Sequence, residues 1–398
     1  MLRRPSAVRR ACLPGSRTYS ASKMEPNRAI LLVGLGGAGC SIVARLAPSL
    51  PAEVKVALID TDAAALAQAN GRETIQLGRA QTRGMGTGGE VSVGTASAES
   101  EEPQLRRLFT GYALVVLVTG LGGGTGSGAA AFLATVATDA GATVLAYATI
   151  PFSHEGERRK RQASEALDKL GAKAHGLVTV QNDLLLLQVS KEAPLSESFA
   201  AADEWVGGAL RALAGTFVPG ALVPADPAAV RSILATPGSP TLFTYGRGEG
   251  AGAALAAARA ANECPLAHAP GATTKAASLF VAVTGGPTLS ATEAFEAVAA
   301  VRMRFGGETT TLLCARVVAD FGDRVEVAVL GASTPVLKPL KKGKGTKPGE
   351  ENQQIFGFAT EDSMRRGLFG GTPLTFIDGQ DVDVPTYIRR AVRLPVGH

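Results

Sequence analysis

Two glycine-rich runs have the composition of anion-binding loops. "GLGGAG" spans Gly34–Gly39 and "GGGTGSG" spans Gly122–Gly128. Glycine costs roughly 0.5–1 kcal/mol per position in regular structure, so such clusters need a reason. Where side chains are missing, backbone N–H groups at a helix start can approach a phosphate closely, and the helix dipole favours its charge. Thr125 and Ser127 add hydroxyl donors, and the absence of G-K-[ST] excludes a Walker loop. We therefore predict a phosphate site of another type.

Each run must be positioned by a strand before it and a helix after it. Apolar, β-branched stretches alternate with helical ones along the first half of the chain, which predicts a doubly wound parallel α/β sheet. Three segments are expected to run from strand through turn to helix: Arg28–Ala47, Glu53–Ala69 and Tyr112–Gly141. Single strands are expected in Ala142–Phe152 and Gly176–Leu186, and a helix in Glu157–Ala174.

The second half predicts a central helix and a smaller α+β domain. The helix covers Ser196–Phe217 and ends at a proline-rich break. Strands are expected at Ser278–Gly286, Thr309–Ala319 and Asp323–Ala332, with a helix over Ser290–Phe305 and the last two strands paired as a hairpin. A polar, lysine-rich stretch from Thr334 onward is typical of a flexible linker.

The composition excludes several classes of protein. Of 398 residues, 45% are hydrophobic and 19% are charged, as in soluble globular proteins. Residues 1–24 contain six Lys or Arg and no acid, and without those six charges the formal net charge of +5 becomes −1. A nearly neutral body argues against a nucleic-acid partner. No apolar run is long enough for a transmembrane helix.

The cysteines and the N-terminus bear on compartment. Cys12, Cys40, Cys264 and Cys314 show no C-x-x-C spacing, so we expect neither a disulfide framework nor a metal site, and a reducing cytoplasm. The Arg- and Ser-rich start resembles an organellar transit peptide. We nevertheless favour a disordered basic tail, or translation beginning at Met24, because a biased composition alone is a weak signal.

The second glycine run carries a family resemblance. "GGGTGSG" matches G-G-G-T-G-[ST]-G, the signature loop of the FtsZ family of bacterial tubulin-like GTPases, and the chain resembles that family over about residues 28–333 and its last 20 or so. The resemblance implies a tubulin/FtsZ-like fold, GTP/GDP binding with Mg²⁺ accompanying the nucleotide, and head-to-tail polymerisation into a cytoplasmic ring at the division site.

The resemblance also assigns nucleotide contacts. The phosphate-binding positions it implies are Gly36, Gly37, Ala38, Gly39, Gly122, Gly123, Gly124, Thr125, Gly126, Ser127 and Gly128, with Thr87, Gly88 and Gly89 near the γ-phosphate. Glu155 and Arg159 match ribose contacts and Asn182 a base contact. Phe199 would stack on guanine, and the Asp203 carboxylate would accept from guanine N1–H and N2–H₂. Cys40 replaces an Asn near the base and ribose and lacks the amide's donors.

The hydrolytic loop departs from the family pattern N-x-D-x-x-D. Asp226 matches the first Asp and is the catalytic candidate, whereas Ala229 replaces the second Asp and Pro224 the Asn. Loss of a charge-positioning group costs on the order of 10²–10³ in rate, so slow GTP hydrolysis is expected. Two alternatives stay open: a non-hydrolysing filament scaffold or regulator, and an NAD-dependent oxidoreductase using "GLGGAG" with Asp60 on the ribose.

The C-terminus resembles the family's partner-binding peptide, which docks division proteins or membrane tethers. Its candidate anchors are Asp383, Val384, Pro385, Tyr387, Ile388, Arg389 and Arg390. The expected organisation is therefore a basic extension (1–27), a GTP-binding domain (28–195), a central helix (196–217), an α+β domain (218–333), a linker (334–376) and the peptide (377–398).

Overall fold

The computed structural model describes residues 30–332 and the pairs 376–377 and 380–381, with gaps inside the first range. The gaps are residues 53, 68, 70, 184–194, 217–220, 224–226, 235–240, 269–274 and 307–308, and the side chains of residues 195–203 and 227–229 are likewise outside it. The chain divides after Leu337 into two units. The described part of the second unit is one strand pair, β11 (Phe376–Ile377) with β12 (Gln380–Asp381).

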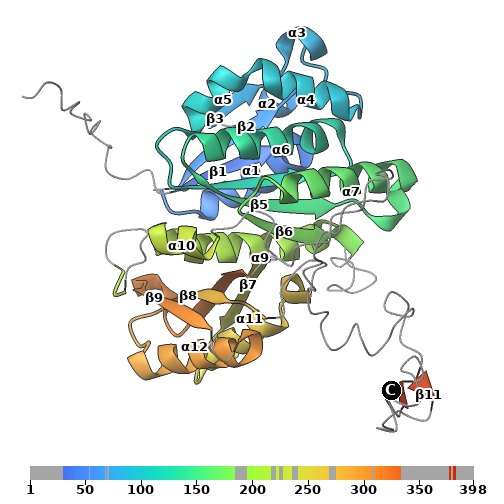
Figure 1. Cartoon of the computed structure of the whole chain (residues 1–398). Coiled ribbons are helices and arrows are strands. Elements are labelled where there is room, and N and C mark those ends of the chain that lie inside the picture. The colour runs from blue at the N-terminus through green and yellow to red at the C-terminus, as the bar shows by residue number, and fades with distance from the viewer. Residues whose placement is uncertain are drawn as a thin grey trace, which may run out of the picture. The chain divides into compact units, whose positions relative to one another are not determined.

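A six-stranded parallel sheet organises the N-terminal half of the first unit (Figure 1). Its order is β3-β2-β1-β4-β5-β6, so the chain builds outward from β1 in one direction and then from β4 in the other. The doubly wound sheet predicted from the sequence is confirmed. The strands are β1 (Ile30–Leu35), β2 (Lys55–Asp60), β3 (Glu73–Gln76), β4 (Leu114–Gly120), β5 (Thr143–Ile150) and β6 (Gly176–Gln181).

Helices cover both faces of this sheet because its strands are apolar on both sides. Alternate residues of β1 enter different cores: Leu32 packs with the first set of helices, Leu31 and Val33 with the second. The first set is α1 (Gly36–Leu46), α2 (Ala63–Ala67), α9 (Leu195–Gly215) and α10 (Pro227–Ile233). The second is α4 (Val91–Ser100), α5 (Glu102–Phe109), α6 (Gly124–Asp139) and α7 (Glu157–Gly171), and α3 (Arg79–Thr82) is a single turn.

A four-stranded sheet forms the C-terminal half, with order β7-β10-β8-β9. Its strands are β7 (Thr241–Gly248), β8 (Ser278–Gly285), β9 (Thr310–Val317) and β10 (Val325–Ala332), and α11 (Ala253–Glu263) and α12 (Ala291–Phe305) cover one face. The expected β9–β10 hairpin is wrong. β8, α12 and β9 form a parallel crossover, and β10 inserts antiparallel between β7 and β8.

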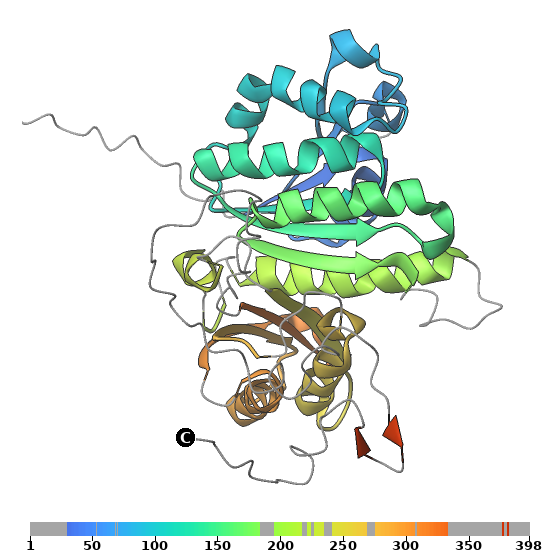
Figure 2. The ribbon, with the colours of Figure 1, turned by 45° about the vertical axis from the view of Figure 1, so that its right-hand side comes forward.

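Helix α9 lies between the two sheets, as both ribbon views show (Figures 1 and 2). Its buried residues, including Val206 and Leu210, share one core with Leu32 of the first sheet and Phe243 of the second. The approach is close: a Cβ added to Gly208 would lie 2.3 Å from the Tyr245 ring. None of the described helices combines the length and apolarity needed to cross a bilayer.

Candidate functional site

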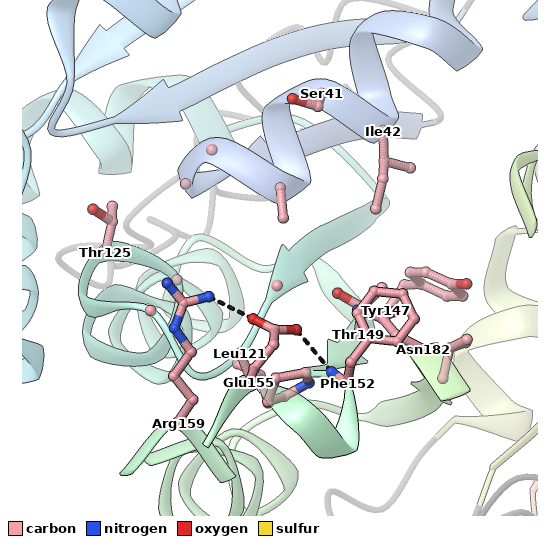
Figure 3. A pocket seen from close by; sticks show the side chains of 18 of the residues that line it. Ser41, Ile42, Leu121, Thr125, Tyr147, Thr149, Phe152, Glu155, Arg159 and Asn182 are labelled. Carbon is pink, nitrogen blue, oxygen red and sulfur yellow. Dashed lines mark hydrogen bonds and ion pairs between the residues drawn. The ribbon is translucent and has the colours of Figure 1, made fainter. Parts of the chain in front are cut away.

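The candidate site lies where the strand order of the first sheet reverses. β1 and β4 are hydrogen-bonded neighbours, with Leu35 opposite Thr119, so both strands end at the same edge of the sheet. Each is followed by a glycine turn and a helix, α1 after β1 and α6 after β4. Parallel sheets bind ligands in the crevice at such a switch point. Here the crevice holds a cavity of about 470 Å³ (Figure 3).

The two glycine turns together form one end of the cavity, the end suited to phosphates. Its lining includes Gly36, Gly37 and Ala38 from the first turn and Gly123, Gly124, Thr125 and Gly126 from the second. The turns nearly touch: Gly36 has a φ of 70°, and a Cβ there would lie 3.2 Å from the Gly126 nitrogen. Two helix N-termini thus converge on one space, an arrangement that favours an anion.

Other glycines of the two motifs do not line the cavity. They allow the loops to pack closely against neighbouring backbone. A Cβ on Gly39 would lie 2.2 Å from the Val118 carbonyl oxygen, and one on Gly128 would lie 2.3 Å from that of Val91. The Ser127 hydroxyl is buried and accepts the Gly122 N–H at 2.8 Å. Ser127 was expected to face the phosphates, whereas here it closes the turn.

A buried hydrogen-bonded network of polar side chains holds Thr125 in place. The Thr125 and Thr61 hydroxyls are 2.7 Å apart, and the Asp60 carboxylate accepts the Thr61 N–H at 2.7 Å. Burial raises the pKa of Asp60 above its ordinary value, while hydrogen bonds from Thr61, Asp62 and Thr125 oppose the rise. Asp60 is 3% exposed and does not line the cavity, which removes the ribose contact that the oxidoreductase hypothesis needs.

The segment expected near the γ-phosphate, residues 87–89, reaches the cavity through Thr87 alone. Gly88 and Gly89 lie outside its lining. Two contacts join this part of the chain to α7. Arg158 Nη2 pairs with Glu90 Oε1 at 2.7 Å, and Gln162 Nε2 donates to the Gly89 carbonyl at 3.3 Å. Both side chains of the ion pair are well exposed, so it adds little to stability.

An ion pair lies between the glycine turns and the opposite, more apolar end of the cavity. Arg159 Nη1 lies 2.5 Å from Glu155 Oε2, and Glu155 Oε1 accepts the Phe152 N–H at 2.8 Å (Figure 3). Phe152, Tyr147 and Asn182 stand together at the more apolar end. The segment 151–159, "PFSHEGERR", thus brings Glu155 and Arg159 to the cavity, and Asn182 after β6 joins them.

Several lining residues were not singled out from the sequence. Ser41, Ile42 and Arg45 come from α1, Tyr147 and Thr149 from β5, and Val206 from α9. The helical spacing from the first glycine turn could have indicated the α1 positions, because residues one turn beyond a helix N-terminus border the same crevice. No comparable signal marks β5.

Cys40, expected near the base and ribose, does not reach the cavity. Its thiol lies on the buried face of α1 and donates to the Gly34 carbonyl at 3.3 Å. Burial, followed by the charge of Asp60, raises the pKa of the thiol to about 12. A neutral thiol facing the sheet replaces the expected contact, so the Asn-to-Cys departure affects core packing.

Some expected site residues lie outside the described part of the chain. The helical backbone of α9 includes Phe199 and Asp203, but their side chains are not described. The same holds for Ala229 in α10, and for Asp226 and Pro224 in full. The tail anchors Asp383, Val384, Pro385, Tyr387, Ile388, Arg389 and Arg390 are also outside it.

Known proteins resemble this chain in sequence. The family model described as Tubulin/FtsZ family, GTPase domain, matches residues 29–190. "Cell division protein FtsZ" of Coxiella burnetii is 33% identical over 377 residues, covering 92% of this chain and 96% of that protein. The protein of the same name in Pseudomonas aeruginosa is 30% identical over 381 residues, covering 91% and 96%.

Solved structures also resemble this chain. An empty FtsZ dimer from M. jannaschii superposes with a TM-score of 0.69 at 28% identity, covering 77% of this chain and 88% of that one. The GDP-bound CetZ1 monomer of Haloferax volcanii, at 17% identity, covers 78% and 95% with a TM-score of 0.64 and shows the shared fold. Paired glycine turns on this fold define a tubulin-like nucleotide-binding protein. The chain belongs to the tubulin/FtsZ family, as a divergent FtsZ-like member.

Proposed function

We propose that this protein binds GTP and assembles head-to-tail into filaments of the cell-division ring, with slow hydrolysis at the subunit interface. One observation carries the proposal: two glycine turns after adjacent strands open onto a single cavity of about 470 Å³. The relatives named as cell-division proteins and the FtsZ dimer support the assembly. A repeated heterologous contact that does not close gives a filament by symmetry.

Guanine selection is proposed to reside on α9. Val206 of this helix lines the cavity. Asp203 precedes Val206 by three residues and Phe199 precedes it by seven, and these spacings recur on one face of an α-helix. A carboxylate at position 203 would accept both guanine donors, and a ring at position 199 would cover the base. Adenine offers no such pair of donors.

The phosphates are proposed to lie between the glycine turns, with Thr125 and Thr87 as hydroxyl donors. Mg²⁺ would arrive with the triphosphate, whose oxygens are suitable ligands for this hard cation. Within the described ranges no cluster of three His, Cys, Asp or Glu side chains offers a separate metal cage. Arg159 would then neutralise charge at the ribose side of the nucleotide, held in place by Glu155.

The slow step is proposed to follow from Ala229 on α10, where the family pattern has a second carboxylate. Asp226 would be the remaining catalytic-loop carboxylate, acting on water in the next subunit. The test combines GTP-dependent sedimentation with phosphate release for the wild type, Ala229→Asp, and Ala228→Asp as the neighbouring control. We expect pelleting with slow release in the wild type, and at least a tenfold faster release in Ala229→Asp only.

Two outcomes would change this proposal. Wild-type turnover of several GTP molecules per minute per subunit would contradict slow hydrolysis. Pelleting with no phosphate release in either the wild type or Ala229→Asp would favour the alternative, a non-hydrolysing scaffold. The tail from residue 377, placed after a lysine-rich linker, is proposed to dock partner proteins at the division site in both cases.

A further inference from the structure

A second cavity, of about 700 Å³, lies away from the glycine turns. One wall is the segment after α1, residues 49–52, and another is α9 with Glu204 and Arg211. The third is the C-terminal sheet, which contributes Arg247 from β7, Arg316 from β9, and Arg324 with Glu326 at the start of β10. The cavity therefore touches both sheet-bearing halves of the first unit and the helix between them.

Positive charge exceeds negative charge in this cavity. Four arginines line it, against the carboxylates of Glu204 and Glu326. Glu204 is shared, because Arg211 Nη2 lies 3.1 Å from its Oε1 and the Tyr245 hydroxyl donates to the same oxygen at 3.4 Å. Arg247 pairs with Glu249, which lies beyond the lining. Among the residues that the structure describes, Arg316 has no carboxylate partner.

The geometry leaves guanidinium donors unused. Arg324 Nε is buried and 3.5 Å from Glu326 Oε1, an ion pair that is too poorly formed to count as a hydrogen bond. The Glu326 side chain is only 5% exposed, and those of Arg211 and Arg324 are 24% and 30% exposed. Arg211 already donates to Glu204 and, through Nη1, to the Ser49 hydroxyl at 3.2 Å. A charge this sheltered is weakly screened by salt, so the unpartnered Nε–H of Arg324 favours an anion.

The remaining lining has a different character. The side chains of Leu50, Pro51 and Val318 form its apolar patch, and Thr284 adds a hydroxyl, whereas the Ser49 hydroxyl already donates to the Leu46 carbonyl at 2.8 Å. Arg324 lies over the Phe321 ring, with its Cζ 4.0 Å from the centroid, within cation–π distance. An inorganic ion alone would leave the apolar patch uncovered. A ligand with both acidic groups and an organic body would contact the arginines, the apolar patch and the hydroxyl together.

We propose that this cavity binds a small organic polyanion, carrying at least two carboxylate or phosphate groups, and that the arginines of α9, β7, β9 and β10 recognise it. Arginine suits either acid because its planar fork gives two parallel hydrogen bonds to carboxylate or phosphate. The ligand touches elements of both sheet-bearing halves, so its binding stabilises their contact through α9. This inference does not rest on the nucleotide function proposed above.

The test is calorimetric titration of the full-length protein, with and without added GDP, at constant ionic strength. Citrate and fructose 1,6-bisphosphate, each with an organic body, serve as the carboxylate and phosphate probes. We expect saturable one-site binding of at least one probe, weakened roughly tenfold or more by Arg316→Gln and by Arg247→Gln. Arg259→Gln, an exposed arginine on α11 outside the cavity, should bind as the wild type does. The stronger probe identifies the acid preferred.

Two variants are needed because Arg316 also packs on α9, where a Cβ on Gly215 would lie 2.6 Å from its Nη1. Thermal unfolding of each variant shows whether it is folded, and the more exposed Arg247 gives an independent reading. Absence of saturable binding of both probes overturns the proposal. So does binding that Arg316→Gln and Arg247→Gln leave intact, since the anion would then occupy another place, such as the glycine turns.

Discussion

At the scale of single residues, the glycines of the two loops serve two distinct purposes. Gly37 is exposed, lines the cavity, and has no atom within 4 Å of an added Cβ. Gly128 is buried between α4 and α6, where an added Cβ would lie 2.3 Å from the Val91 carbonyl oxygen. Sequence spacing identifies both as one kind of motif, but only the structure separates ligand approach from helix packing.

This separation predicts opposite phenotypes for Gly37→Ala and Gly128→Ala. Gly37→Ala should fold with unchanged or slightly higher stability, because alanine favours helix by about 0.8–1 kcal/mol. It should weaken GTP binding about tenfold by obstructing a charge-assisted backbone hydrogen bond. Gly128→Ala should instead lose about 1–3 kcal/mol of unfolding free energy through overpacking. Urea unfolding and nucleotide titration measure the two effects, and a Gly128→Ala protein as stable as the wild type would contradict the packing assignment.

At the scale of elements, sequence patterns predicted the long apolar segments well. β1, β4, β5 and β6, and the helices α6, α7 and α12, lie within the expected ranges, and α9 begins one residue before its expected range, at Leu195. Helix α4, "VSVGTASAES", was missed because small residues replace the apolar periodicity, and β7 because "TLFTYGRG" contains two glycines. Those glycines are needed: a Cβ on Gly246 or Gly248 would lie 2.2 Å from a backbone oxygen of α11. Such close backbone contacts produce no periodic pattern of apolar residues in the sequence.

The junction of β5, β6 and α10 contains a pH-sensitive hydrogen bond. His175, just before β6, accepts the Val144 N–H at its Nδ1 at 3.1 Å, and Arg231 of α10 donates to the nearby Gly141 carbonyl at 3.0 Å. Burial, and then the charge of Arg231, lowers the pKa of His175. A folded-state pKa below the unfolded value means that the stabilisation is complete above about pH 6.5. It is lost as the pH falls through the folded-state pKa.

We therefore expect the free energy of unfolding to fall between pH 7 and pH 5, and to fall less steeply in His175→Gln, whose amide oxygen keeps an acceptor without titrating. His154→Gln, at an exposed histidine, is the control and should follow the wild type. Asp60, whose raised pKa acts with the opposite sign, is present in all three proteins and cancels in the differences. Parallel curves for the wild type and His175→Gln would show that this hydrogen bond carries no pH dependence.

At the scale of the whole molecule, α9 joins the two sheets through one shared hydrophobic core. The sequence predicted the helix and the sheet class, but not this junction, because it depends on two distant residues of unequal size. Gly208 leaves the space that the Tyr245 ring fills, and burial, followed by the charge of Glu326, raises the pKa of that tyrosine. Trp205, the single tryptophan of the chain, packs against the same core.

This shared core predicts that both sheets unfold together. Trp205 fluorescence and far-ultraviolet circular dichroism should give coincident urea transitions in the wild type, since one cooperative unit loses both signals at once. Gly208→Ala should lower the unfolding free energy by about 1–3 kcal/mol, because the new methyl group meets the Tyr245 ring.

Adding Tyr245→Leu to Gly208→Ala should recover part of that loss by making room, so that the double-mutant cycle gives a favourable coupling between the two positions. Tyr245→Leu alone, which removes the ring and its hydrogen bond to Glu204, measures the cost of the smaller side chain and completes the cycle. Additive losses would mean that the two residues act independently. Transitions that separate in the wild type would mean that α9 belongs to one sheet only, because a core divided at Gly208 and Tyr245 would let either half unfold while the other stayed folded.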